Sequence, residues 1–247
     1  TLAGIAYGMY RMERDHIHHT WVVSSAISIR NNWDEVLANY ELPYVFVEEL
    51  TDLEYIQPGC FVLITLNMVS TYRKQLKKWI RKHNQKVCLV FDESDEISNN
   101  SSVRTKAMLD CFRRCRTKLL TTGTSTRNNI SEFAPQLELM YNNSFNMLSW
   151  SPLIYHFDKE DGCITEDYND YYGKPIPAYK KGYSLFSASH LPEKVTVFGI
   201  GQRTQDIYNA DTLSAILGKT VITRTFEEVA GKDIKRIHQV PLQFSEE

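Results

Sequence analysis

The amino-acid sequence predicts an α/β fold in which helices cover both faces of a parallel β-sheet. Two observations lead to this prediction. Along the first 145 residues, short apolar runs rich in Val, Ile and Phe alternate with longer amphipathic segments. The runs are apolar at nearly every position, which is typical of strands that are buried on both sides. Strands of this kind occur in parallel sheets whose two faces are covered by helices.

The expected elements alternate along the chain. Strands are predicted at residues 20–25, 44–50, 60–66, 87–91 and 118–122. Helices are predicted at residues 2–14, 31–40, 68–83, 102–114 and 129–141. Asn31 is expected to cap the second of these helices, because an Asn side chain accepts a hydrogen bond from the first free backbone N–H groups.

The character of the sequence changes after about residue 145, where aromatic residues, Pro and Gly become frequent and no period is visible. We therefore expect a lobe at residues 1–145 and an irregular, mostly helical extension at residues 146–247. Within the extension, residues 193–203 suggest a pair of strands and residues 219–226 a strand. A short helix is expected to stop at Gly218.

Bulk properties exclude some classes of protein. No apolar run approaches the roughly 18–20 residues of a membrane span, so no membrane association is expected. A net charge of -2 gives no overall attraction to nucleic acid. The 5 cysteines form no CxxC pair, which indicates structural thiols in a reducing compartment. We expect an intracellular protein, cytoplasmic or nuclear, or a viral protein that acts inside a host cell.

One segment is strongly basic. Residues 73–86 contain seven Lys or Arg side chains and no acid. Two interpretations are open. The segment could line a nucleic-acid path, or it could be the solvated face of a helix whose Leu76, Trp79 and Ile80 point into the core.

Polar side chains follow three of the predicted strands. They occur in "SSAIS" from Ser24, "DESDE" from Asp92 and "TGTSTRNN" from Thr122. Ligands of parallel sheets bind beyond the carboxyl ends of the strands, so the three clusters predict a functional site at this edge. Asp92 and Glu93 alone fit either a magnesium site with a water-activating neighbour or a solvated strand end.

The third cluster, which begins at Thr122, decides between these two interpretations because it adds a resemblance to a known family. The stretch from Asp92 to Met140 resembles motifs II and III of superfamily 2 helicase-like ATPases, most closely those of the Swi/Snf-type branch. The matching residues are Asp92, Glu93, Asn99, Ser102, Ala107, Thr122, Gly123, Thr124, Asn128, Asn129 and Glu132. Residues 20–40 are similar to motif Ia and residues 61–70 to motif Ib. The chain departs from the pattern at Asp95, where His is usual, and at residues 125–127.

The resemblance implies a RecA-like first motor lobe that uses ATP and Mg²⁺ and works together with a second RecA-like lobe. By position, Asp92 would hold the Mg²⁺ shell and Glu93 would activate water. Thr122, Gly123 and Thr124 would couple hydrolysis to nucleic-acid contacts. The resemblance implies that the motor moves along double-stranded DNA. The residues that would contact this DNA are Ser24, Ser25, Arg30, Asn31, Thr65 and Arg127.

Such motors bind phosphate with a glycine-rich loop that ends in Gly-Lys-Thr. The resemblance implies that Thr1 is the threonine of this loop and a Mg²⁺ ligand; the alternative is that Thr1 only starts a helix. "LGKT" at 217–220 lacks the preceding glycine of such a loop. Because the second lobe would supply arginines that accelerate hydrolysis, residues 1–247 alone are expected to have little ATPase activity. The rival hypothesis is a degenerate lobe that only binds nucleic acid or protein.

Overall fold

The structure is a computed structural model that forms two compact units, Thr1–Ala210 and Asp211–Glu247. It describes residues 1–124, 130–141, 152–158, 160–170, 172–174, 182–190, 193–196, 199–202, 208–225, 228 and 231.

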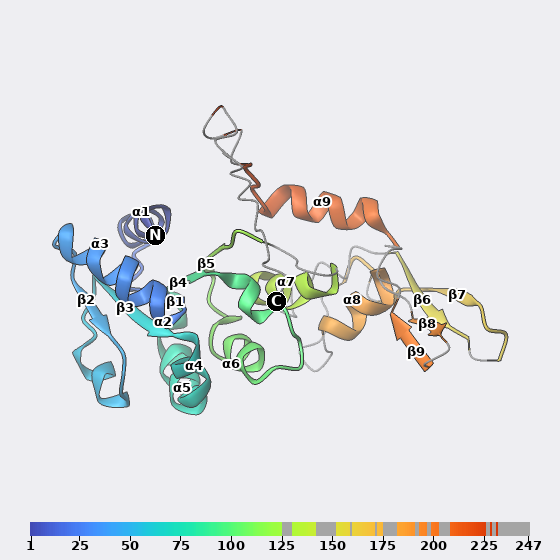
Figure 1. Cartoon of the computed structure of the whole chain (residues 1–247), viewed down its shortest axis with the longest axis horizontal. Helices are drawn as coiled ribbons and strands as arrows, with labels where there is room; N and C mark the ends of the chain where they lie inside the picture. Colours follow the sequence, from blue (N-terminus) through green and yellow to red (C-terminus); the bar gives the residue numbers. More distant parts are fainter. Residues whose placement is uncertain are drawn as a thin grey trace, which may run out of the picture. The chain divides into compact units, whose positions relative to one another are not determined.

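A five-stranded parallel sheet forms the centre of the first unit (Figure 1). Its strands are β1 (His19–Ser24), β2 (Tyr44–Phe46), β3 (Cys60–Thr65), β4 (Val87–Asp92) and β5 (Thr117–Thr121). They lie in the order β2-β3-β1-β4-β5, and every neighbouring pair is parallel. The predicted parallel α/β fold is confirmed, and its arrangement is RecA-like.

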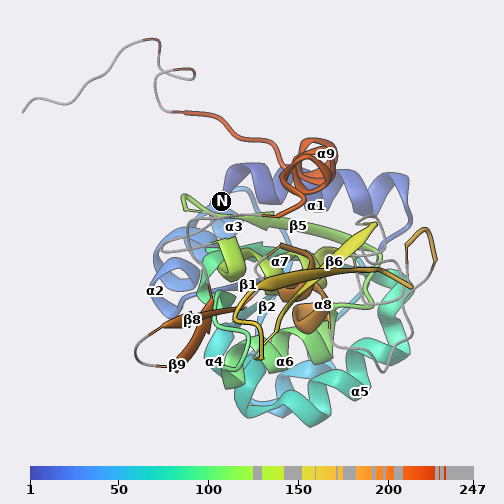
Figure 2. The same ribbon diagram turned by 90° about the vertical axis from the view of Figure 1, so that its right-hand side faces the viewer.

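Helices cover both faces of this sheet (Figures 1 and 2). On one side lie α1 (Leu2–Arg14) and the helical segment formed by α2 (Ala26–Ser28), the π-helical turn Ile29–Trp33 and α3 (Asp34–Asn39). On the other side lie α4 (Leu66–Thr71), α5 (Arg73–His83) and α6 (Val103–Phe112). Residues Ile130–Phe133 form a 3-10 turn that leads into α7 (Ala134–Tyr141).

The alternation of side chains along β1 explains why both faces need cover. Trp21 and Val23 belong to the core cluster that includes residues of α5 and α6. Val22, between them, belongs to the cluster that includes Ile5 of α1 and Trp33. Successive side chains of a strand point to opposite faces, so an apolar strand requires apolar partners on both sides.

Two glycines let α1 pack closely against the sheet. A Cβ atom on Gly4 would lie 2.6 Å from Cη2 of Trp33 and 3.0 Å from Cγ1 of Val90. A Cβ atom on Gly8 would lie 2.8 Å from Cγ2 of Thr20. The Tyr7 hydroxyl also donates a 3.0 Å hydrogen bond to the Lys118 carbonyl of β5, which fixes the helix along the sheet.

We expect Gly4→Ala to destabilise the fold by about 1–3 kcal/mol, because the added methyl group overfills a tightly packed contact. Gly218→Ala is the matched control, since no atom lies within 4 Å of the added Cβ in that helix. The control should be neutral or slightly stabilising. Urea denaturation of both variants measures the difference, and equal stability of the two would contradict this packing.

A group of rings closes the opposite, amino-terminal edge of the sheet. His19 is 5% exposed and lies beside Trp79, His18 and His83, with ring centroids 5.6, 5.9 and 6.3 Å from its own. Its Nδ1 is 3.2 Å from the Gln57 carbonyl. Burial lowers the pKa of His19 from 6.5 to about 4.

The pKa of His19 predicts a pH dependence of stability. Between pH 6.5 and about 4 the unfolded chain binds a proton at His19 that the folded chain does not bind. Stability is therefore complete above pH 6.5 and falls by about 2–3 kcal/mol as the pH drops to 4, because each unit of pKa difference between the folded and unfolded chain is worth about 1.4 kcal/mol. Denaturation of the wild type and of His19→Phe across this range measures the effect. A wild-type pH dependence that persists unchanged in His19→Phe would contradict this assignment.

Several boundaries differ from the sequence-based prediction. The helix expected from Asn31 begins at Ala26, and its cap is Ser25, whose hydroxyl accepts a 3.2 Å hydrogen bond from the Ser28 N–H. The single helix expected over residues 68–83 is two helices, α4 and α5. The Ser70 and Thr71 hydroxyls donate to carbonyls of their own turn, a local bond that competes with helix continuation.

The extension contains strands as well as helices. β6 (Leu153–Phe157) pairs with β7 (Ile164–Tyr168), a hairpin that the sequence pattern did not predict. β8 (Glu193–Thr196) and β9 (Gly199–Gln202) confirm the strand pair expected at 193–203, and α8 (Gly182–His190) precedes them.

The second unit corrects two predictions. α9 (Ala210–Thr220) continues through Gly218, which therefore does not stop the helix. An isolated glycine weakens a helix by only about 1 kcal/mol, and its neighbours here favour helix. The strand expected at 219–226 is wrong over the described residues, because residues 219–220 are helical and residues 221–225 are exposed and have no regular structure.

The cysteines confirm the structural interpretation. Cys60, Cys88, Cys111 and Cys115 are buried and free, whereas Cys163 is exposed. Burial raises the pKa of Cys88, Cys111 and Cys115 to about 12, so these thiols stay protonated. Among the described residues, no helix is both long enough and apolar enough to span a membrane.

Candidate functional site

The carboxyl ends of β1, β3, β4 and β5 meet at one edge of the sheet, as the sequence predicts. Each strand ends in a polar residue: Ser24, Thr65, Asp92 and Thr121 respectively. Ser24 pairs with Thr65 in the register of β1 and β3, and Asp92 pairs with Thr121 in the register of β4 and β5. The parallel arrangement thus brings together residues that are far apart in the sequence.

Three donors hold the Asp92 carboxylate. Oδ2 accepts hydrogen bonds from the Trp33 indole N–H at 3.0 Å and from the Ser28 hydroxyl at 3.3 Å. Oδ1 accepts one from the Thr121 hydroxyl at 2.9 Å. The donors come from three different elements, α2, the π-helical turn and β5, so the carboxylate has a fixed orientation.

Trp33 links this carboxylate to helix α1. The indole is 1% exposed, and its Cη2 atom lies against the backbone of Gly4 near the start of the helix. Thr1 stands at the N-cap position of that helix and its side chain makes no capping hydrogen bond. Neither Trp33 nor Ser28 has a role predicted from the sequence, although both lie in the segment that resembles motif Ia.

The residue after Asp92 has an unusual backbone. Glu93 is exposed and adopts φ 56 and ψ 52, the left-handed region that residues with a Cβ rarely occupy. Such conformations cost of order 1 kcal/mol or more and concentrate at functional sites. The sequence predicted a special role for Glu93 but not this conformation.

A second acid of the same segment contacts the threonine cluster. Asp95 is 3% exposed, and its Oδ1 accepts a 3.0 Å hydrogen bond from the Thr122 hydroxyl. The Thr122 oxygen in turn accepts from the Thr124 N–H at 3.0 Å. Asp95 is therefore a direct link between the two segments and not only a departure from the family pattern. Gly123, between the two threonines, has open space around it.

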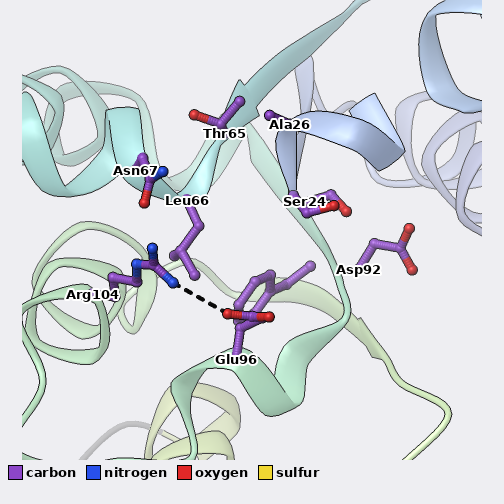
Figure 3. Close-up of a pocket in the computed structure, with 10 residues that line it drawn as sticks. Ser24, Ala26, Thr65, Leu66, Asn67, Asp92, Glu96 and Arg104 are labelled. Carbon is purple, nitrogen blue, oxygen red and sulfur yellow. Dashed lines mark hydrogen bonds and ion pairs between the residues drawn. The ribbon is translucent and has the colours of Figure 1, made fainter. Parts of the chain in front are cut away.

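Only some of the predicted nucleic-acid contacts line a common pocket. Ser24, Ser25 and Thr65 line one pocket of about 140 Å³ together with Asp92 (Figure 3). The Thr65 hydroxyl also caps α4 by accepting from the Met68 N–H at 3.2 Å.

The remaining candidates do not line this pocket. Arg30 pairs instead with Glu48 at 3.1 Å, and Asn31 is exposed in the π-helical turn. Arg127 lies outside the described residues, as do Asn128 and Asn129.

The basic segment forms the outer face of α5. Leu76 and Ile80 are buried and Trp79 packs against the same core, as the second interpretation expected. Arg73 and Lys77 are paired with Asp110 of α6. Lys74, Lys78, Arg81 and Lys82 are exposed. A role of this face in binding nucleic acid stays a prediction.

The fold is RecA-like, and the polar edge of its sheet resembles that of helicase-like ATPases. A curated relative, the chromatin-remodeling ATPase INO80 of Arabidopsis thaliana, is 25% identical over 188 residues, which are 67% of this chain and 12% of that protein. The match confirms the resemblance to Swi/Snf-type ATPases, and it spans about an eighth of the relative's length. No family model matches the chain.

A solved structure is also similar, the SWI2/SNF2 ATPase core of Sulfolobus solfataricus in complex with dsDNA. Its identity to this chain is 19% and the TM-score is 0.46, over 56% of this chain and 28% of that one.

Proposed function

We propose that the chain contains the first motor lobe of an ATP-dependent nucleic-acid translocase whose track is double-stranded DNA. The observation that carries the proposal is the direct link between the acidic segment and the threonine segment, made by Thr121 with Asp92 and by Thr122 with Asp95. The resemblance to Swi/Snf-type ATPases supports it. We propose that the lobe comprises residues 1–145 and that the protein acts inside the cell.

Asp92 suits a role in holding Mg²⁺ through its water shell. Mg²⁺ keeps several waters and needs only one or two carboxylates. The described residues contain no group of three His, Cys, Asp or Glu side chains that could hold a metal ion, which agrees with an outer-shell role better than with a carboxylate cage. When bound, Mg²⁺ would neutralise charge on the phosphates of ATP. The Thr1 hydroxyl, which makes no capping bond, is proposed as a further oxygen ligand.

Glu93 is proposed to orient the attacking water and accept its proton. Its strained backbone carries the carboxylate immediately beyond Asp92 and into an exposed position. The glycine-rich phosphate loop and the arginines that complete such a site would come from outside residues 1–247. A second RecA-like lobe would provide those arginines.

Thr122, Gly123 and Thr124 are proposed to couple hydrolysis to movement on the track. A change in the position of Asp95 reaches Thr124 through the Thr122 hydroxyl. Ser24, Ser25, Arg30, Asn31, Thr65 and Arg127 are proposed to contact the nucleic-acid backbone, with binding that depends on salt rather than on sequence.

The experiment that tests the proposal is ATP turnover by the full-length protein with and without duplex DNA. Turnover that rises with DNA supports the motor. The rival function, a lobe that binds nucleic acid or protein without hydrolysis, predicts DNA binding with no turnover. That outcome would replace the proposal.

A further inference from the structure

A positively charged side chain, Arg104, lines the pocket at the sheet edge, and it is not among the nucleic-acid contacts predicted from the sequence. Arg104 of α6 lines it together with Asn67 of α4 and Glu96. Figure 3 shows the Arg104 guanidinium reaching toward Glu96, while the carboxylate of Asp92 lies on the other side of the pocket. A volume of about 140 Å³ is sufficient for a single phosphate group.

An unsatisfied hydroxyl lines the same pocket. Ser24 is 1% exposed, and its Oγ has no hydrogen-bond partner among the described residues. A buried polar atom without a partner costs free energy, so such atoms usually mark the place of a water or a ligand. Thr65 and Asn67, which carry neutral polar side chains, border the same space.

The pair that Arg104 makes with Glu96 is weak enough to exchange. Arg104 Nη1 lies 3.3 Å from Glu96 Oε2, and the side chains of Arg104 and Glu96 are 48% and 38% exposed. Exposed pairs of this kind contribute little to stability, whereas a phosphate offers a guanidinium two parallel hydrogen bonds. A phosphate that enters the pocket would therefore displace Glu96 as the partner of Arg104.

We propose that Arg104 is an additional contact to the phosphate backbone of duplex nucleic acid, and that Glu96 restrains it until the backbone binds. This inference rests on the proposed function, because it adds a residue and a control element to the same edge. Arg104 is the cation of the pocket lining, and the Asp92 carboxylate is engaged by three donors on the opposite side. A phosphate that enters from the Glu96 side would therefore meet Arg104 rather than Asp92.

A rival ligand for this pocket is a metal cation, since Asp92 and Glu96 both border it. The described residues include no group of three His, Cys, Asp or Glu side chains that could hold a metal ion, and the guanidinium of Arg104 lies beside Glu96. The donor set therefore matches a phosphate oxygen better than a metal ion.

The test is fluorescence anisotropy of a labelled DNA duplex with the full-length protein over a range of salt concentrations. Glu96→Gln should tighten binding about two- to fivefold, because it releases Arg104 from its partner. Arg104→Gln should weaken binding and reduce the slope of log K against log salt by about 0.9, the loss of one phosphate contact. The double variant, Glu96→Gln with Arg104→Gln, should not show the tighter DNA binding of Glu96→Gln. Such a result would show that the increase in affinity depends on Arg104.

Asp15→Asn is the matched control. It makes the same change in net charge and releases Arg11 from an exposed pair at the end of α1, away from the pocket. Equal affinities of Glu96→Gln and Asp15→Asn would overturn the role of Glu96. An unchanged salt slope in Arg104→Gln would overturn the contact, while DNA binding by the wild type would leave the proposed function standing. Failure of the wild type to bind duplex DNA would sink both.

Discussion

Glu93→Gln is expected to lower ATP turnover of the full-length protein by about 10²- to 10⁴-fold, the contribution of a positioned general base. Glutamine has nearly the same size and cannot accept the proton of the attacking water. Binding of ATP should persist, because Glu93 is proposed to contact the water and not the nucleotide. Single-turnover hydrolysis and nucleotide binding by the same protein separate the two effects.

Glu41→Gln provides the control for this experiment. Glu41 also has a positive φ, 53 compared with 56 for Glu93, and it lies in the turn between α3 and β2, away from the edge. The control makes the same chemical change in the same backbone conformation. It should leave turnover unchanged, and an equal loss in both variants would show that Glu93 has no chemical role.

Substitution of Trp33 is expected to affect both the stability of the fold and the Mg²⁺ requirement. Trp33→Ala should destabilise the fold by about 3–5 kcal/mol, because a fully buried indole is replaced by a cavity. Trp33→Phe keeps most of the apolar contact but removes the N–H that Asp92 accepts, at a cost of about 1–3 kcal/mol. If Asp92 holds the Mg²⁺ shell, Trp33→Phe should also raise the Mg²⁺ concentration that half-maximal ATP turnover requires.

The natural comparison is Trp21→Phe. Trp21 is also fully buried, but it lies in the core on the other face of the sheet and its indole N–H has no partner among the described residues. This variant should lose stability only through the change in shape, and its Mg²⁺ requirement should not move. Urea denaturation and Mg²⁺ titration of all three variants distinguish the role of packing from the role of the donor. Identical Mg²⁺ requirements in Trp33→Phe and Trp21→Phe would remove Trp33 from the site.

The strands and the site edge could be predicted because their signal is local. β1, β3 and β4 are runs of apolar residues, and Asp92 and Thr65 are the polar residues at which two of them end. Helix boundaries were less accurate, since the start of α2 depends on which of several polar residues accepts a backbone hydrogen bond. Ser25 rather than Asn31 does so.

The partners of the site residues could not be predicted, because they depend on tertiary contacts. Trp33 reaches Asp92 from another element, and Arg104 meets Glu96 only after α6 has packed on the sheet. The importance of Asp95 was missed for a related reason. The sequence marked it only as a departure from the family pattern, whereas the structure buries it against the Thr122 hydroxyl.

The distribution of the thiols has a practical consequence for single-molecule work on this protein. Cys163 is exposed between β6 and β7, whereas the other four cysteines are buried. Thiolate is the reactive form, and the three buried thiols with a pKa of about 12 supply almost none of it at neutral pH. A maleimide dye would therefore attach selectively to the hairpin of the unaltered chain, which gives a fluorescent reporter on the extension without any substitution in the lobe.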